Sequence, residues 1–483
     1  MKLQNLVKFN QQGFFEGAVQ LGWFQNRVDQ ANIAASTFIF HGPQYHGALN
    51  DQEQHTLKDT ASIVVELIES VAKAQQGRED NPYWLATAGY GAGKSHLAVT
   101  IATLLSKPKT PLASFILENL ARVDAQLGLR AQQSIANLTK PSLVIALDGM
   151  GNFHLGNELN RVVLRQLEIH KVNDQAIRDL SPRFTIAQKF VEKNYHLQLD
   201  KFKNLLGQYD QAVILKSLSD HDEEIYSAVD QIFLDSTGSV IPVDGQESAQ
   251  DLLQTLCNEY CGENKPFENI IILFDEFGRY LEYAADRPDL AGDSTLQQIF
   301  QGIQDNSDKI RFLGFIQYEL KTYLKRFNAK NARQLQRYIT RFDTANKVHL
   351  SSNLETIFAN IIQKDESELS TLLSKYSSDD IFHQTWLRLS QYIPKSKLYP
   401  VWSNEKLFNQ IIAKGCWPLH PFATWLLTRQ ENTVQSRSAL TFIKDLLQKN
   451  AELDVFNTSH LLQISAADLV QDYLLDEMLA AEH

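Results

Sequence analysis

Residues 83–95 read Tyr-Trp-Leu-Ala-Thr-Ala-Gly-Tyr-Gly-Ala-Gly-Lys-Ser. The first five residues predict a short buried strand, and a helical pattern from Ser95 to Leu105 follows the glycine-rich turn. Glycines allow positive φ angles and let backbone N–H groups approach an anion, and the first turn of a helix adds unpaired N–H groups and a favourable dipole. The stretch therefore predicts an anion-binding turn between a strand and a helix.

This turn has the spacing of a P-loop, the phosphate-binding motif G-x-x-x-x-G-K-[ST], with Ala88 at the position of the first glycine. We expect Lys94 to reach the β- and γ-phosphates and the Ser95 hydroxyl to ligate Mg²⁺. The imidazole of His96 is expected to pack or to hydrogen-bond within the protein. The expected cofactors are ATP and Mg²⁺, and the residues expected around the nucleotide are Gly89, Tyr90, Gly91, Ala92, Gly93, Lys94, Ser95 and His96.

Further apolar runs predict buried parallel strands at residues 143–147, 270–274, 312–316 and 348–350. Helical patterns separate these runs, and strands that alternate with helices are typical of a parallel α/β sheet. Counting residues 83–87 as the first strand, we expect the spatial order 5-1-4-3-2.

Two carboxylates, Asp275 and Glu276, end the run at 270–274. Because ligands of open α/β sheets bind where the parallel strands end, we expect both carboxylates beside the phosphate-binding turn. Asp275 is expected to support Mg²⁺, and Glu276 to act as the general base that polarises the attacking water. A solvated acidic turn is the alternative. Asp148, after the run at 143–147, is expected either in the outer shell of the metal or as a turn residue.

Two polar side chains are candidates for contacts with the reacting nucleotide. Gln317 follows the run at 312–316 and is placed to touch the γ-phosphate or the attacking water, the sensor 1 role of AAA+-like ATPases. Arg437 begins a helical pattern in the C-terminal region and is a candidate to fold back onto the nucleotide, the sensor 2 role. An ordinary strand end and an ordinary helix start are the alternatives.

Residues 321–347 contain eight basic residues and a single acidic one. Arg333, Arg337 and Arg341 are spaced by four, so they share one face of a helix. Arg341 is the first candidate for an arginine finger that reaches the nucleotide of a neighbouring subunit, and Arg337 is the second. A stripe that binds nucleic-acid phosphates and a solvated face are the alternatives.

The patterns divide the chain into three parts. Residues 1–57 are expected to form an N-terminal lead-in packed on the next domain, residues 58–350 the nucleotide-binding core, and residues 351–483 a helical lid with following helices. The gap between Asp148 and Asn269 is too long for one crossover helix, so we expect a helical insertion at about 157–245.

Within this insertion, helical patterns cover residues 184–194, 197–207 and 210–233. After residue 350 the pattern is helical throughout. The last helical pattern, at 466–481, has no terminating signal, from which we expect a fragment of a longer protein.

Composition and charge exclude several classes of protein. Hydrophobic residues make up 43% and charged residues 21% of the 483 residues, which excludes a disordered, collagenous or coiled-coil protein. The formal net charge of −11 excludes a protein that coats nucleic acid with its whole surface. No apolar run approaches the ~18–20 residues of a membrane span. Three cysteines are too few for a disulfide framework and favour a cytoplasmic location.

Three short motifs resemble those of a known group of proteins. Residues 89–97, residues 273–280 and the Trp-Pro-Leu-His-Pro segment at 417–421 are similar to the large P-loop ATPases of prokaryotic anti-phage defence, in particular the BREX-type ATPases. The resemblance spans roughly residues 80–450. It implies an ASCE, AAA+-like P-loop NTPase fold with a helical lid, a homo-oligomer, partner proteins of a defence system, and DNA bound directly or through these partners.

The expected function is that of a Mg²⁺-dependent ATPase of a bacterial defence complex, which couples ATP binding and hydrolysis to assembly or to action on DNA. Two alternatives stay open. One is a STAND-type nucleotide switch that scaffolds an effector and hydrolyses ATP slowly. The other is a DNA-binding scaffold in which the P-loop serves only assembly.

Overall fold

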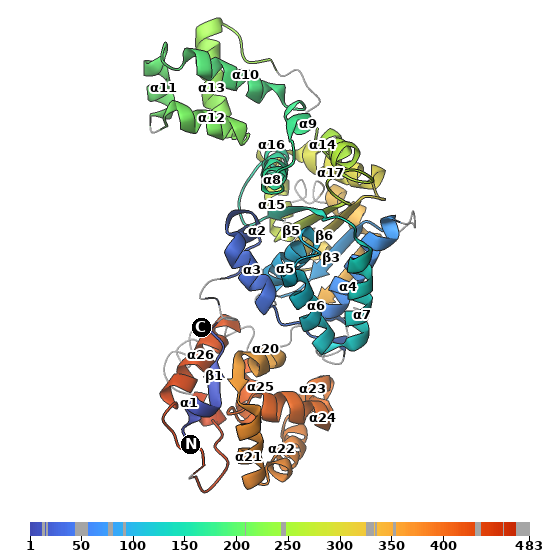
Figure 1. Cartoon of the computed structure of the whole chain (residues 1–483), viewed down its shortest axis with the longest axis vertical. Coiled ribbons are helices and arrows are strands. Elements are labelled where there is room, and N and C mark those ends of the chain that lie inside the picture. The colour runs from blue at the N-terminus through green and yellow to red at the C-terminus, as the bar shows by residue number, and fades with distance from the viewer. Residues whose placement is uncertain are drawn as a thin grey trace.

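Three bodies follow one another along the long axis of the molecule (Figure 1). A sheet covered by helices forms the middle body, a helical arm extends from one side of it, and a mainly helical C-terminal unit lies on the other side. The computed structural model describes residues 1–11, 15, 18–43, 57–75, 81–89, 93–207, 209–242, 248–324, 333, 336–350, 354–429, 436–456 and 458–469.

The sheet of the middle body has six parallel strands in the order β2-β7-β3-β6-β5-β4. They are β2 (Leu57–Lys58), β3 (Tyr83–Thr87), β4 (Leu143–Asp148), β5 (Ile270–Asp275), β6 (Ile310–Ile316) and β7 (Asn346–Leu350). The five strands expected from the sequence are present in the expected order. Only β2 was missed, because two residues are too few to carry a periodic pattern. This α/β architecture is compatible with a P-loop NTPase-like fold.

Helices cover both faces of the sheet, which explains why the central strands β3, β5 and β6 are buried along almost their whole length. One face packs against α3 (Val28–Thr37), α4 (Thr60–Gln75), α5 (Lys94–Ser106), α6 (Pro111–Val123) and α7 (Ala125–Asn137). The other face packs against α8 (Leu155–Ile169), α14 (Ala249–Thr255), α15 (Phe277–Asp286), α17 (Asp293–Asp305) and α18 (Leu320–Leu324). The short helices α2 (Trp23–Asn26), α9 (Gln175–Arg178) and α16 (Pro288–Ala291) lie beside them.

The arm consists of four helices between β4 and β5 with a hydrophobic cluster of their own. They are α10 (Pro182–Asn194), α11 (Leu199–Leu206), α12 (Gln211–Ser219) and α13 (Glu223–Thr237). The prediction of a single helix at 210–233 is wrong, because the helix is interrupted between α12 and α13. His221 has a φ of 57° there, and the Asp222 carboxylate caps α13 by accepting from the N–H groups of Glu224 and Ile225.

The C-terminal unit has one hydrophobic cluster, to which residues near the N-terminus also contribute. Its main elements are α20 (Leu354–Ile361), β8 (Ile362–Lys364), α21 (Glu366–Lys375), α22 (Ser378–Tyr392), α23 (Pro400–Ser403), α24 (Glu405–Leu407), the π-helix Phe408–Gly415, α25 (Pro421–Arg429) and α26 (Ser436–Lys449). Two expectations are corrected by this unit. It is not purely helical, and it includes the N-terminal residues.

The N-terminal segment joins the C-terminal unit and not the middle body. Helix α1 (Leu3–Leu6) leads into β1 (Val7–Phe9), which pairs antiparallel with β8 and lies beside α26 (Figure 1). The side chains of Leu3, Leu6 and Val7 are buried in the cluster of this unit. The lead-in is therefore divided, since residues 21–40 pack on the middle body as expected.

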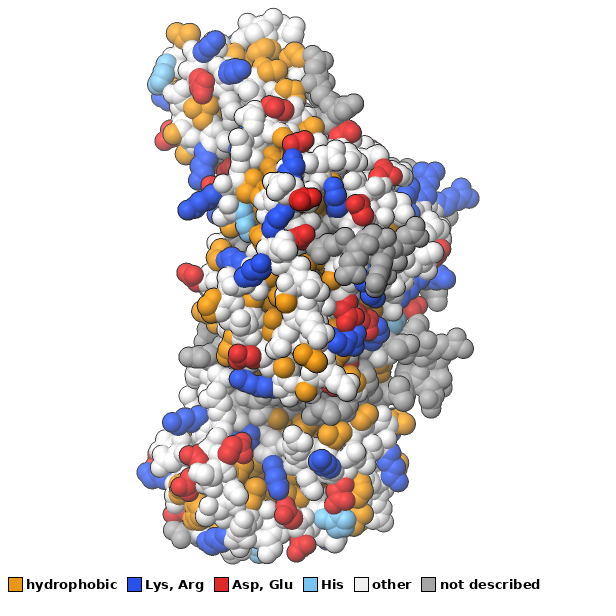
Figure 2. Space-filling view, turned by 45° about the vertical axis from the view of Figure 1, so that its right-hand side comes forward, with side chains coloured by type: hydrophobic (Ala, Val, Ile, Leu, Met, Phe, Trp, Pro, Cys, Tyr) orange, Lys and Arg blue, Asp and Glu red, His pale blue; other side chains and the backbone are white. Residues whose placement is uncertain are grey.

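Three further observations bear on the sequence-based expectations. Of the helix expected at 466–481, the structure describes one 3₁₀ turn, Ala466–Leu469, and residues 470–483 lie outside the described residues. No helix within the described ranges is both long enough and apolar enough to cross a bilayer. Acidic and basic side chains are interspersed over the face of the molecule in Figure 2.

Candidate functional site

The turn after β3 leads directly into α5, as the motif requires. Ala88 continues the sheet, because its N–H donates to the carbonyl of Ile316 at 3.0 Å, and its side chain is buried. An alanine therefore fits at the position of the missing glycine. Gly93 precedes α5 with a φ of 79°, a conformation that favours glycine. Tyr90, Gly91 and Ala92 lie outside the described residues.

Lys94 is the buried cation of the site. Its ammonium donates to the carbonyl oxygens of Ala88 at 3.1 Å and Gly89 at 3.0 Å, and lies 3.9 Å from Oε1 of Glu276. Its side chain is only 5% exposed, and burial lowers its pKa, against the opposing charges of Glu276 and Asp275. Two carbonyls are weak compensation for a buried ammonium, so this position favours a strongly anionic ligand.

Asp275 ends β5 next to the start of α5. Burial raises the pKa of Asp275 to about 6, against the opposing effect of the nearby Ser95 hydroxyl. A hydroxyl and a carboxylate are the oxygen ligands that Mg²⁺ prefers, so the two side chains fit a magnesium site. No cluster of three or more His, Cys, Asp or Glu suited to a metal exists among the described residues. The remaining ligands of an ion here would have to be water or phosphate oxygens, the usual partners of Mg²⁺.

Glu276 and Gln317 form a direct pair at the ends of β5 and β6. The Gln317 amide donates to Oε2 of Glu276 at 3.0 Å. Glu276 itself has a φ of 50°, an uncommon conformation for a residue other than glycine, and it precedes α15. The sequence placed Gln317 at this end of the sheet to contact the nucleotide or water. The structure adds that its amide holds the candidate general base.

Asp148 lies beside Asp275, because the two residues are register partners at the ends of β4 and β5. Oδ1 of Asp148 accepts from the N–H of Met150 at 3.0 Å, which is a turn-forming bond. The N–H of Gly149 donates to the Asp275 carbonyl at 2.9 Å, and a Cβ on Gly149 would lie 2.5 Å from the Glu276 carbonyl. Gly149 is thus needed for the close approach of this turn to the acidic pair.

The imidazole of His96 faces away from the phosphate-binding turn. Its Nε2 lies 2.6 Å from the Ala34 carbonyl of α3, and its ring packs edge-on against Phe38 with centroids 5.0 Å apart. Burial lowers the pKa of His96 to about 4, so the ring is neutral at pH 7. The side chain therefore has the packing role expected of it, and only its backbone lies in the first turn of α5.

Arg341 lies at the opposite end of the sheet from the phosphate-binding turn of its own chain. It is exposed on the 3₁₀ turn Thr340–Phe342, whose Phe342 ring packs 5.8 Å from the ring of Tyr83 at the start of β3. The glycine-rich turn before Lys94 follows the other end of that strand. Arg341 is therefore not positioned to reach Lys94 and Glu276 of its own chain, and a finger role would require a second subunit.

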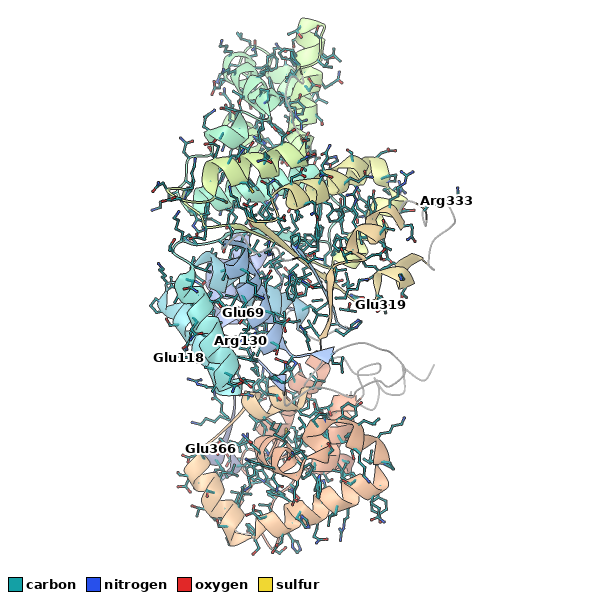
Figure 3. The ribbon with its side chains drawn as sticks, turned by 90° about the vertical axis from the view of Figure 1, so that its right-hand side faces the viewer. Glu69, Glu118, Arg130, Glu319, Arg333 and Glu366 are labelled. Carbon is teal, nitrogen blue, oxygen red and sulfur yellow. The ribbon has the colours of Figure 1, made fainter. Side chains whose placement is uncertain are left out.

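The other basic candidates are only partly described. Arg333 and Arg337 are exposed, and Figure 3 shows Arg333 projecting from the side of the middle body. Residues 325–332 lie outside the described residues, so the shared helical face of the three arginines stays a prediction. Arg437 is in the first turn of α26 in the C-terminal unit, but its side chain lies outside the described part of the chain.

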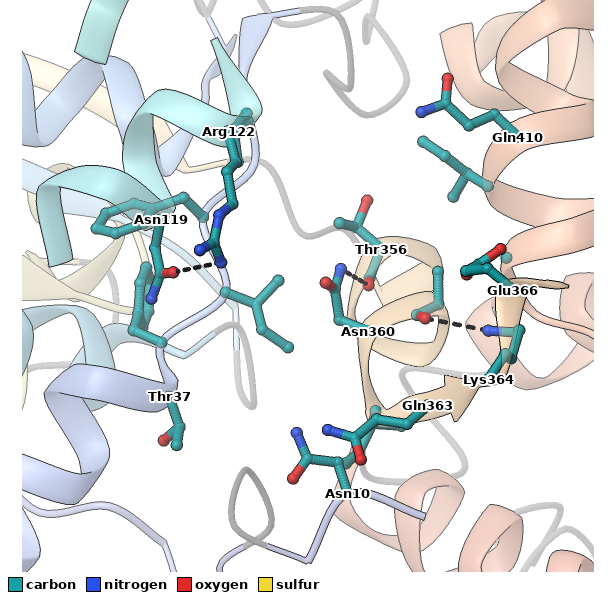
Figure 4. Close-up of a pocket in the computed structure, with 18 of the residues that line it drawn as sticks. Asn10, Thr37, Asn119, Arg122, Thr356, Asn360, Gln363, Lys364, Glu366 and Gln410 are labelled. Carbon is teal, nitrogen blue, oxygen red and sulfur yellow. Dashed lines mark hydrogen bonds between the residues drawn. The ribbon is translucent and has the colours of Figure 1, made fainter. Parts of the chain in front are cut away.

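A polar cleft of about 860 Å³ separates the middle body from the C-terminal unit (Figure 4). Thr37, Asn119 and Arg122 line one wall, and Asn360, Lys364 and Gln410 line the other. Lys364 donates to the carbonyl oxygens of Ile362 and Ala359, and burial lowers its pKa to about 8. The described residues of the glycine-rich turn do not line this cleft, so it is separate from the convergent site.

The convergent site consists of Lys94, Ser95, Asp275, Glu276 and Gln317 at the ends of three adjacent parallel strands. They form a buried, charged site where the parallel strands end, and the sheet that carries it is compatible with a P-loop NTPase-like fold. A scan against protein-family models gave no match, and neither did a search of curated proteins.

Proposed function

We propose that this protein is a Mg²⁺-dependent ATPase. The observation that carries the proposal is the convergence of a buried lysine, a serine–aspartate pair and a glutamate–glutamine pair at one end of a parallel sheet. This placement is where open α/β folds bind ligands, and phosphoryl transfer needs this combination of cation, metal ligand and base. A solvated acidic turn does not account for a buried Asp275 that lies next to Ser95.

Each residue has a defined part in the proposed reaction. Lys94 and the N–H groups that begin α5 bind the phosphates, and Ser95 and Asp275 hold Mg²⁺, which would neutralise charge on the phosphates. Glu276 accepts a hydrogen bond from the attacking water and orients it toward the γ-phosphorus. Gln317 fixes the Glu276 carboxylate through the 3.0 Å contact.

The test is a phosphate-release assay on the purified protein with ATP, with and without Mg²⁺, EDTA and duplex DNA. We expect steady hydrolysis that EDTA stops. Isothermal titration with a non-hydrolysable ATP analogue should give 1:1 binding that depends on Mg²⁺. Absence of both binding and hydrolysis would refute the proposal, whereas binding without turnover would point to the second candidate below.

A slow nucleotide switch is the second candidate, and one contact favours it. Both carboxylate oxygens of Glu276 have a partner, Gln317 at 3.0 Å and Lys94 at 3.9 Å, so the base must be released before it can orient water. A switch should co-purify with bound nucleotide and turn over more slowly than about once per minute, as unassisted GTPases do. Mass spectrometry of nucleotide released by denaturation separates it from an ATPase that turns over steadily.

The wider role is proposed on the resemblance of the motifs alone. It places the ATPase in the cytoplasm, in a homo-oligomer that works with other proteins of an anti-phage defence system and acts on DNA directly or through them. The acidic net charge requires any direct DNA contact to come from a local patch such as residues 321–347. Electrophoretic mobility of labelled duplex DNA with the purified protein, at two salt concentrations, tests whether that contact exists.

A further inference from the structure

Tyr323 of α18 lies between the two turns that carry Glu276 and Gln317. Its side chain is buried, with 3% exposure. Its hydroxyl oxygen accepts from the backbone N–H of Gln317 at 3.4 Å, and the N–H of Tyr318 also donates to it. The hydroxyl therefore binds the backbone of the turn that follows β6.

The same side chain rests on the first turn of α15. A Cβ on Gly278 would lie 2.2 Å from the Tyr323 hydroxyl oxygen and 2.4 Å from the ring carbon that bears it. Gly278 follows Glu276 by two residues. Because Gly278 has no side chain, the Tyr323 ring can approach the backbone at this point. Tyr323 thus touches both turns, one through its hydroxyl and one through its ring.

We propose that Tyr323 is a positioning residue that clamps the turn after β6 against the start of α15, and so sets the distance between Gln317 and Glu276. The inference rests on the proposed ATPase function and goes beyond it, because the sequence patterns gave Tyr323 no role. Tyr323 acts through Gln317, whose amide holds the candidate base.

The clamp has a simple physical basis. Glu276 has an uncommon positive φ, a conformation that costs energy and persists only where its surroundings hold it. Gly149 packs against the acidic pair from the β4 side, and Tyr323 packs against Gly278 from the α18 side. Loss of either support should let the first turn of α15 relax and move the Glu276 carboxylate away from Gln317.

The first experiment compares Tyr323→Phe with the wild-type protein. This change removes the hydroxyl and keeps the ring, so the fold should be retained. We expect kcat for ATP hydrolysis to fall about three- to tenfold, the rate equivalent of one ordinary hydrogen bond. The Kd of a non-hydrolysable ATP analogue should not change. Tyr318→Phe is the matched control, because Tyr318 is in the same turn with its side chain exposed, and it should keep the wild-type rate.

Two double-mutant cycles test the route of the effect. If Tyr323 acts through Gln317, Tyr323→Phe should lower kcat much less in a Gln317→Ala background. If Gly278 matters because of the tyrosine, Gly278→Ala should lower kcat in the wild type and have little effect beside Tyr323→Leu, which leaves room for the methyl group. Losses that multiply independently in both cycles would overturn the clamp.

Hydrogen exchange gives a readout that does not depend on hydrolysis. Tyr323→Phe should speed exchange of the backbone N–H groups of Gln317 and Tyr318 and of the first turn of α15, while the middle of β5 stays protected. Unchanged exchange in both turns would refute the clamp even in an active enzyme. A wild-type protein without ATPase activity would refute the proposed function, and the exchange experiment would still decide whether Tyr323 joins the two turns.

Discussion

The two ends of the central sheet differ in chemistry. At the end where the strands finish, Lys94, Asp275 and Glu276 are close together and largely buried. At the end where they start, Tyr83 is held by a 2.7 Å hydrogen bond to the Phe300 carbonyl within an aromatic cluster, and Arg341 is exposed nearby. The first end can act within one chain. At the second end the Arg341 side chain is exposed to solvent. Arg341 could take part in catalysis only by contacting another molecule.

Replacing Arg341 tests this difference most severely. If Arg341 serves a neighbouring subunit, Arg341→Ala should lower hydrolysis by ~10³–10⁵-fold while each chain still binds ATP. Mixing Arg341→Ala protein with Glu276→Gln protein should recover activity, because a mixed interface can pair an intact arginine with an intact base. Phosphate release from the mixture, against each variant alone, is the measurement.

The opposite result for Arg341 is equally informative. Full ATPase activity of Arg341→Ala with weaker DNA binding would exclude the finger. The residue would then belong to a phosphate-binding stripe, and the slope of log K against log salt should fall by about one.

Glu276→Gln tests the candidate general base at the end where the strands finish. The amide keeps the shape of the side chain and its contact with Gln317, but it cannot accept a proton from water. We expect ATP binding to persist and hydrolysis to fall by ~10²–10⁴-fold. Single-turnover hydrolysis beside titration with ATP measures both. A variant as fast as the wild type would show that another group is the base.

Lys94→Ala removes the cation at this end. The loss of two charge-assisted hydrogen bonds to phosphate, each worth ~1.5–3 kcal/mol, should weaken ATP binding by about 100-fold or more. Isothermal titration measures the change. Lys109→Ala is the control, since that exposed ammonium donates only to the Thr139 carbonyl among the described residues and should leave the affinity unchanged. An unaltered Kd in Lys94→Ala would end the P-loop interpretation.

Asp275→Asn should separate stability from function. Because the pKa of Asp275 is raised to about 6, the folded state holds its proton more tightly than the unfolded state, and stability falls as pH rises from about 4 to 6. Above that range the buried carboxylate destabilises the fold, by about 3 kcal/mol. The metal-free variant should therefore melt higher than the wild type at pH 7.5 and equally at pH 4, while losing Mg²⁺-dependent ATP binding. Melting temperatures that differ equally at both pH values would contradict this account.

The sequence predicts features that depend on neighbouring residues and misses features that depend on contacts between distant segments. The strand ends, the turn before Lys94 and the carboxylates after β5 are local patterns, and parallel strands bring such ends together whatever the rest of the chain does. The Gln317–Glu276 contact and the packing of Tyr323 against Gly278 depend on where α15 and α18 pack. No residue spacing within α15 or α18 encodes these two contacts.

Two other features were missed for related reasons. The interruption at His221 looked like continuous helix, because apolar spacing persists through the three residues between α12 and α13 and only the cap at Asp222 marks it. The pairing of β1 with β8 joins three-residue strands at distant points of the chain. Such short strands carry almost no periodic signal, and long-range pairing has no local signature.

That pairing has a consequence for how the polypeptide is made. Val7 leaves the ribosome long before Lys364, its register partner, which at ~5–20 residues per second means a wait on the order of tens of seconds. In that interval the middle body can fold on its own hydrophobic clusters, while Leu3, Leu6 and Val7 have no surface to join and are exposed to chaperones. An expression design that starts after residue 10 would leave β8 as an open strand edge, a recognised cause of aggregation.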